Sequence, residues 1–176
     1  MNRRLKVIHV LDKFGKEGAT VHGITRLLMM WFPRWDTNQF DVELVVLRPW
    51  DAACDRVKEL IPDVISVDKG KFDPSTLTSL TRLFREKKAD IVHLHGYGAH
   101  NFGRIAARMS GARIVLHEHF VDPKYPGYQR IADMALARVI DHGFGVSKSV
   151  QTFMTQDRCM PTEKGELLYK GAPLKD

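Results

Sequence analysis

The chain has 176 residues, 44% of them hydrophobic, so it is long enough for one domain with a buried core. Its longest uninterrupted apolar run covers residues 27–32, far short of the roughly 20 residues that cross a bilayer, which excludes a membrane-spanning helix. The net charge of +6 and the isoelectric point near 9.4 favour an anionic partner. Charge alone does not distinguish a phosphorylated substrate from a phospholipid surface or nucleic acid.

The amino terminus and the cysteines predict a cytoplasmic protein. Residues 2–4 are polar or basic and lead straight into a strand pattern, without the apolar stretch of a secretory signal. Cys54 and Cys159 lie 105 positions apart and form neither a metal-ligand motif nor a disulfide framework, which fits a reducing compartment.

The first half of the chain alternates strand and helix patterns. Residues 5–11 form an apolar strand, and Thr20 is the expected N-cap of a helix that carries apolar residues at helical spacing until Pro33. The next expected elements, in order, are a strand at 42–47, a helix at 52–60, a strand at 64–67, and a helix that opens at 73–75 and stops at 87–88.

The second half continues the alternation. Its expected elements are a strand at 91–95, a helix at 100–109 that ends at Gly111, a strand at 113–118, a helix at 128–139, a strand at 142–146, a helix capped by Ser147, and a last strand at 167–169. This order predicts an α/β fold, a doubly wound, mostly parallel sheet with helices on both faces and right-handed crossovers.

Titratable side chains gather at the carboxyl ends of two of these strands. His95 and Tyr97 end or follow the strand at 91–95, and Glu118 and His119 end the strand at 113–118. Ligands of open parallel sheets bind in the crevice outside the carboxyl ends of the strands, so these four residues are candidates for substrate contact. Glu118 faces the opposite side of its strand from His119, which leaves its role less defined.

The loop after the first strand is a candidate phosphate site. Gly15 and Gly18 let the backbone approach a ligand closely, Lys16 adds a cation, and Ala19 precedes the expected helix start, whose free N–H groups attract anions. The dinucleotide fingerprint and the Walker lysine pattern are absent, which disfavours a nicotinamide dehydrogenase and a P-loop enzyme. A structural alternative is that the glycines only make a tight strand-to-helix turn.

Five segments, in order, resemble the amino-terminal domain of a retaining glycosyltransferase with the GT-B fold, of the family four type. They are residues 15–19, 89–96, 115–119, 144–149 and 168–172, and Lys170 stands where the family usually has asparagine. The resemblance implies that residues 1–170 are a Rossmann-like acceptor-side domain, that 171–176 begin the interdomain linker, and that the donor-binding second domain is absent. No pair of glutamates separated by seven residues, which that domain carries in the family, occurs here.

The resemblance also implies an activity. The parent protein would be an enzyme that moves a sugar from a nucleotide-diphosphate donor to a saccharide or lipid-linked acceptor in polysaccharide or glycolipid assembly, without a metal or other cofactor. This chain alone would be inactive, needing the carboxyl-terminal domain in cis or in trans. His119 matches the family histidine that orients the reacting sugar, and a donor there stabilises the charge that develops as the bond to diphosphate breaks. His95 and Tyr97 would line the acceptor side.

Two other classes of function remain open. His93 with His95, and His117 with His119, face the same way on neighbouring strands, so they are also candidate metal ligands of a metallohydrolase, although no carboxylate ligand is evident. The second alternative is a non-catalytic α/β binding module that kept the sheet and lost its partner domain.

An anionic membrane surface is a further expected partner. Residues 27–35 are mostly apolar and aromatic, contain Arg34 and are flanked by Arg26, a composition that seats an amphipathic helix on lipid at the inner face of the membrane. The competing interpretation is a helix packed on the sheet. Nucleic acid is not expected, because the basic residues are scattered and no nucleic-acid motif accompanies them.

Overall fold

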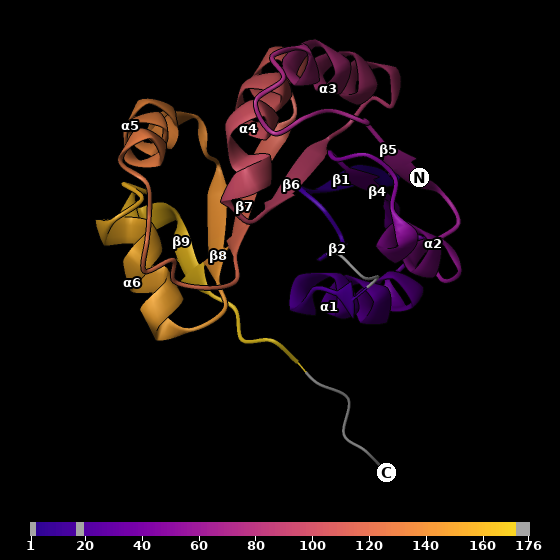
Figure 1. The fold of residues 1–176 in the computed structure, drawn as a ribbon, viewed down its shortest axis with the longest axis horizontal. Helices are drawn as coiled ribbons and strands as arrows, with labels where there is room; N and C mark the ends of the chain where they lie inside the picture. The colour runs from indigo at the N-terminus through magenta and orange to yellow at the C-terminus, as the bar shows by residue number, and fades with distance from the viewer. Residues whose placement is uncertain (1–2, 17–19, 172–176) are drawn as a thin grey trace.

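Seven parallel strands form the central sheet of the protein in a computed structural model that describes residues 3–16 and 20–171 (Figure 1). The strand order is β5-β4-β1-β6-β7-β8-β9. From β1 the chain winds outward in one direction to β5 and then returns to the other side of β1, so the switch point lies between β1 and β6. The expected doubly wound parallel sheet is confirmed. The strands are β1 Leu5–Leu11, β4 Phe40–Val46, β5 Val64–Ser66, β6 Ile91–His95, β7 Arg113–Glu118, β8 His142–Gly145 and β9 Gly165–Leu167.

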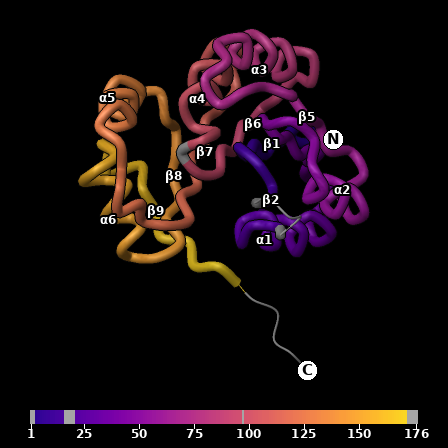
Figure 2. The backbone as a smooth tube through the Cα atoms, in the orientation of Figure 1, coloured from indigo at the N-terminus to yellow at the C-terminus, as the bar shows by residue number. Residues whose placement is uncertain are grey.

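Helices cover both faces of this sheet. The helices α3 (Ser75–Glu86) and α4 (Tyr97–Ser110) pack side by side on one face, and α1 (Gly23–Trp31) lies on the other (Figure 1, Figure 2). The remaining helices are α2 Ala52–Lys58, α5 Gly127–Leu136 and α6 Lys148–Gln156, with 3-10 turns at Phe32–Arg34, Ala137–Val139 and Thr162–Lys164.

The core follows from the alternation of side chains along each strand. Even-numbered residues of β1, β6 and β7 pack against α3 and α4, among them Ile8, Leu94 and Leu116, all nearly inaccessible to solvent. The opposite face of β4 packs Leu44 and Val46 against α1 and α2. On β1, β6 and β7 that opposite face carries His9, His93, His95 and His117 among aliphatic residues, which makes it unlike an ordinary core.

The first helix begins later than the sequence suggests. Thr20 is not its N-cap, because Thr20–Val21 form the short strand β3, which pairs antiparallel with β2 (Gly15–Lys16). Residues branched at Cβ fit an extended ribbon better than a helix start. The helix therefore begins at Gly23, with His22 as its extended N-cap.

Other boundaries differ by a turn or less. The helix expected from residue 100 starts at Tyr97, and the last strand covers Gly165–Leu167 rather than 167–169. Two predicted caps are confirmed. The Ser147 hydroxyl accepts the Val150 N–H of α6 at 3.2 Å, and Gly111 ends α4 at φ 82°, a left-handed conformation that glycine adopts without steric cost.

The apolar side of α1 is a packing face. Leu27 and Leu28 are buried, whereas Arg26 and Arg34 are exposed. The leucines expected to enter a lipid surface therefore pack in the interior of the domain. Within the described residues, no helix combines the length and the hydropathy needed to cross a bilayer.

Candidate active site

A cavity of about 410 Å³ opens at the carboxyl ends of β1, β6 and β7, beside the switch point of the sheet. We call it the crevice. The described residues that line it come from four strand-to-helix connections and from the segment after β9: Leu11, Asp12, Lys13, His22, Gly23, Ile24, Lys71, His95, Gly96, Gly98, His119, Phe120 and Lys170.

Two glycines bring the start of α4 to the crevice. Gly96 has φ 67°, which turns the chain sharply from β6 into the helix. At Gly98 an added Cβ would lie 2.7 Å from the Cβ of Asp12, so only glycine allows the helix to rest against the end of β1. The segment after β6 therefore forms one wall of the crevice.

The charge of the crevice suits an anion. Lys13, Lys71 and Lys170 line it, and Asp12 supplies the one carboxylate among the described lining residues. That carboxylate is paired with Arg48. The first residue of α1, Gly23, also faces the crevice, so the positive end of the helix dipole adds to the lysines.

Five imidazoles lie together on the α1 face of the sheet, below and beside the crevice. We call them the histidine layer: His9, His93, His95, His117 and His119. They occupy alternate positions of β1, β6 and β7 or, for His119, the position just beyond β7. Neighbouring rings of the layer stack, with centroids 4.4 Å apart for His93 and His95 and 4.2 Å for His117 and His119.

Burial makes the layer neutral. It lowers the pKa of His9 to about 3, that of His117 to about 4 and that of His119 to about 2. Electrostatic repulsion acts in the same direction: a proton on His117 opposes protonation of His9 and His119, and the Lys170 ammonium opposes protonation of His117 and His119. Each of these rings therefore carries a single N–H near neutral pH.

The layer meets one requirement of a metal site and fails another. Ligand nitrogens lie within 4.8 Å of one another in the triplets His9/His93/His95 and His95/His117/His119. Two imidazoles on a tetrahedral Zn²⁺ hold their ring centres about 5 Å apart, because each Zn–N bond is about 2.0 Å long. Each triplet contains a pair stacked closer than this, at 4.4 and 4.2 Å respectively, so the in-plane lone pairs do not converge on one point.

We therefore expect the purified chain to hold much less than one Zn²⁺ ion per molecule after it is loaded with zinc and dialysed. Elemental analysis measures the bound metal, and the same treatment of His95→Ala, which removes the residue shared by both triplets, gives the background from other sites. Stoichiometric zinc in the unmodified chain that disappears in His95→Ala would instead support the metal interpretation.

Glu118 points away from the crevice into a buried ion-pair network. It is fully buried, its carboxylate pairs with Arg158, and its Oε1 accepts the backbone N–H of His119 at 3.0 Å. Arg158 also donates to both oxygens of Asp133, at 2.9 and 3.1 Å. The network ties β7 to α5 and to the segment just after α6, and it holds the backbone that carries His119. Glu118 therefore supports the site without lining the crevice.

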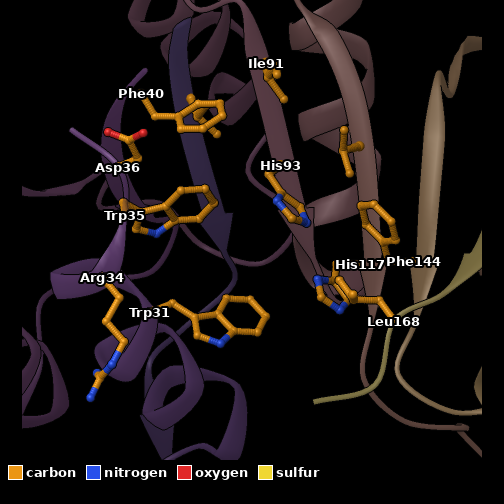
Figure 3. A pocket seen from close by; sticks show the side chains of 12 residues that line it. Trp31, Arg34, Trp35, Asp36, Phe40, Ile91, His93, His117, Phe144 and Leu168 are labelled. Carbon is orange, nitrogen blue, oxygen red and sulfur yellow. The ribbon is translucent and has the colours of Figure 1, made fainter. Parts of the chain in front are cut away.

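A second, apolar pocket of about 500 Å³ lies further down the same face of the sheet (Figure 3). His93 and His117 point into it from β6 and β7, and Trp31 and Trp35 face them from across the pocket (Figure 3). Its few charged groups, Arg34 and Asp36, come from the segment after α1. This pocket lacks the convergent cations of the crevice, so we place the polar chemistry in the crevice.

The structure brings part of the expected site together. His95 and His119 both line the crevice, and Tyr97 is the first residue of α4 beside them. Gly15 and Lys16 belong to the ribbon strand β2, and Gly15 is not among the crevice-lining residues. Gly18 and Ala19 lie outside the described residues.

Sequence reasoning missed four residues. His9 is the single histidine in β1, and no residue near it in the sequence marks it as a partner of His95. Lys13, Lys71 and Lys170 come from three distant segments, and only their convergence on the crevice singles them out. For these lysines the sequence offered one signal, which is that Lys170 stands where the family usually has asparagine.

Comparisons with known proteins identify the family and the fold. The family model described as Glycosyltransferase Family 4 matches residues 21–176. The chain is 33% identical over 121 residues to UDP-Gal:alpha-D-GlcNAc-diphosphoundecaprenol alpha-1,3-galactosyltransferase of Escherichia coli, a match that covers 65% of this chain and 29% of that protein.

Two solved structures share the fold. HepE of Anabaena in complex with UDP and glucose has a TM-score of 0.69 at 15% identity, over 96% of this chain and 45% of HepE. The lipopolysaccharide outer core galactosyltransferase WaaB has a TM-score of 0.71 at 12% identity, over 97% of this chain and 47% of WaaB. The chain thus spans less than half the length of each of these relatives.

Proposed function

The chain belongs to glycosyltransferase family 4, and from this membership we propose that it is the acceptor-side half of an enzyme that transfers a sugar from a nucleotide-diphosphate donor to a saccharide or lipid-linked acceptor. The observation that carries the proposal is a neutral imidazole, His119, in a cation-lined crevice at the switch point of a GT-B-type sheet. In this proposal residues 1–170 form the acceptor-side domain, and 171–176 lead toward a donor-binding domain supplied by the rest of the parent protein.

The geometry supports separate roles for the lysines and the histidine. As the bond between sugar and diphosphate breaks, negative charge grows on the leaving group. Lys13, Lys71 and Lys170 favour an anion in the crevice, so no metal ion is needed on this side of the site. His119 keeps one ring nitrogen, Nδ1, without a partner among the described residues. This atom is buried, but the ring lines the crevice, so a small shift of the ring would bring Nδ1 into contact with a substrate oxygen.

The relatives support the proposed substrates. The Escherichia coli enzyme carries UDP-galactose and a diphosphoundecaprenol-linked acceptor in its name, and HepE was solved with UDP and glucose. We therefore propose a UDP-sugar as donor. A lipid-linked acceptor would bring the enzyme to the inner face of an anionic membrane, with two exposed cations available to that surface, Arg26 of α1 and Arg34 of the 3-10 turn that follows it.

Transfer by the chain and by its full-length parent tests the proposal. With a UDP-sugar and a diphosphoundecaprenol-linked saccharide, the parent is expected to release UDP and to lengthen the acceptor, whereas this chain alone is expected to do neither. The reason is that the proposed donor-binding groups lie outside the chain. Turnover by the chain alone would contradict the half-site assignment, and a parent that transfers none of the common UDP-sugars would contradict the function.

A further inference from the structure

His95 is hydrogen-bonded at both of its ring nitrogens to other histidines. Its Nε2 lies 2.9 Å from Nδ1 of His9, and its Nδ1 lies 3.0 Å from Nε2 of His119. The three rings are 0, 2 and 7% exposed for His9, His95 and His119. They form a chain that starts in the interior, on β1, crosses β6 and ends at the crevice, beyond β7.

This arrangement couples the three protonation patterns. Each neutral imidazole has one N–H and one bare nitrogen, so His95 donates one of its two hydrogen bonds and accepts the other. If His95 donates from Nδ1, His119 accepts at Nε2 and holds its own proton on Nδ1, and His9 donates from Nδ1. If His95 donates from Nε2, the protons of all three rings lie on Nε2. The chain therefore has two states, and each gives all three rings the same tautomer.

The interior end of the chain favours the Nδ1–H state. The Nε2 of His9 is buried without a partner among the described residues, and the ring lies against Phe32 and Trp35, at centroid distances of 5.6 and 5.5 Å. The indole Nε1 of Trp35 is a second buried donor that the described residues leave unpaired. A proton on His9 Nε2 would place two unsatisfied N–H groups in one apolar region, whereas a bare Nε2 leaves only one. At the other end of the chain, Nδ1 of His119 is also buried without a partner among the described residues. His119 lines the crevice, however, so a small shift of its ring lets a substrate or water oxygen accept a proton from Nδ1, a possibility that His9 lacks.

We propose that His95 is a positioning residue, which, backed by His9, holds His119 in the Nδ1–H tautomer, so that a small shift of the His119 ring at the wall of the crevice makes Nδ1–H a hydrogen-bond donor to the substrate. The proposal deepens the proposed function and rests on it, since it assigns His119 a donor role toward the substrate. Metal binding by the same nitrogens is the competing use of the layer, and the stacked ring pairs disfavour it.

Nitrogen NMR of the chain labelled with ¹⁵N-histidine tests this directly, because the two tautomers of a neutral imidazole give different nitrogen shifts. The expected result at neutral pH is the Nδ1–H form for His9, His95 and His119 alike. An Nε2–H form at any one of the three, or a protonated ring, would overturn the proposal. No substrate is involved, so this result stands whether or not sugar transfer is found.

Two variants separate positioning from packing. His95→Asn keeps an N–H donor near the position of Nδ1, and His119 is expected to stay in the Nδ1–H form. His95→Leu removes both hydrogen bonds, and His119 is expected to become a mixture of tautomers. In the full-length protein, turnover should fall by roughly tenfold in His95→Leu, which is less than the loss expected when the donor His119 itself is removed. In His95→Asn, turnover should be largely retained.

His142→Ala is the matched control, because this partly exposed histidine of β8 lies outside the chain of hydrogen bonds. It should change neither the tautomer of His119 nor the turnover. If His95→Leu leaves His119 fully in the Nδ1–H form, or if His95→Asn loses as much turnover as His95→Leu, the positioning role is wrong.

Discussion

Replacing His119 by alanine in the full-length enzyme should lower turnover by about 10² or more while the domain stays folded. The size follows from the loss of one preorganised donor to developing charge, an effect of roughly 3 kcal/mol in comparable sites. His119 is the one member of the histidine layer that both reaches the crevice and keeps a ring nitrogen without a partner among the described residues. Initial rates with saturating donor, together with the thermal midpoint, measure the effect.

His93→Ala is the control for this experiment. His93 belongs to the same layer and stacks on His95, but it lines the apolar pocket and not the crevice (Figure 3). Its loss should cost stability through packing, with turnover falling only as far as the folded fraction falls. Wild-type turnover in His119→Ala, or equal losses in the two variants at equal folded fractions, would show that the crevice is wrongly assigned.

Replacing Arg158 by alanine should destabilise the domain by about 3–5 kcal/mol, because it removes the counter-ion of two buried carboxylates. Arg158 is 4% exposed and pairs with Glu118 and Asp133, both of which are almost completely buried. Asp133 keeps Arg104 and Tyr125 as partners, but among the residues that the structure describes the Glu118 carboxylate keeps only the backbone N–H of His119. Urea unfolding of the chain measures the loss, which corresponds to a fall in Tm of roughly 6–20 °C.

The stability lost in Arg158→Ala should also depend on pH. Burial already raises the pKa of Glu118, and Arg158 opposes that rise, so its removal raises the pKa further. A carboxyl whose pKa is higher in the folded than in the unfolded state makes the folded state bind more protons, and stability then falls as pH rises. Arg158→Ala should therefore be more destabilising at pH 8 than at pH 5.

Arg82→Ala is the matched control for Arg158→Ala. Arg82 pairs with Glu86 on the exposed side of α3, where both side chains are more than half exposed. An exposed pair of this kind contributes about 0.5 kcal/mol or less, with little dependence on pH. If the two arginine variants lose similar amounts of unfolding free energy, the buried ion-pair network does not stabilise the domain as we infer.

The order and type of the main elements were accessible from the sequence. Apolar periodicity is a local property, so β1, β6 and β7 were delimited to the residue, and a serine and a glycine marked the ends of α6 and α4. The start of α1 was misplaced for a reason that is not local. Thr20–Val21 are strand only because Gly15–Lys16 lie beside them.

The strand-end histidines were likewise accessible, because alternate residues of a strand share a face whatever the strand packs against. Which strands are neighbours is decided by long-range packing, and this placed His9 of β1 beside β6 and allowed the chain from His9 through His95 to His119. The same long-range packing brought three lysines to one crevice and paired Glu118 with an arginine 40 positions away. Local residue patterns thus specify which elements form and which residues end the strands. The partners of those residues depend on long-range packing, because hydrogen bonds and ion pairs require distances that periodicity along the chain does not contain.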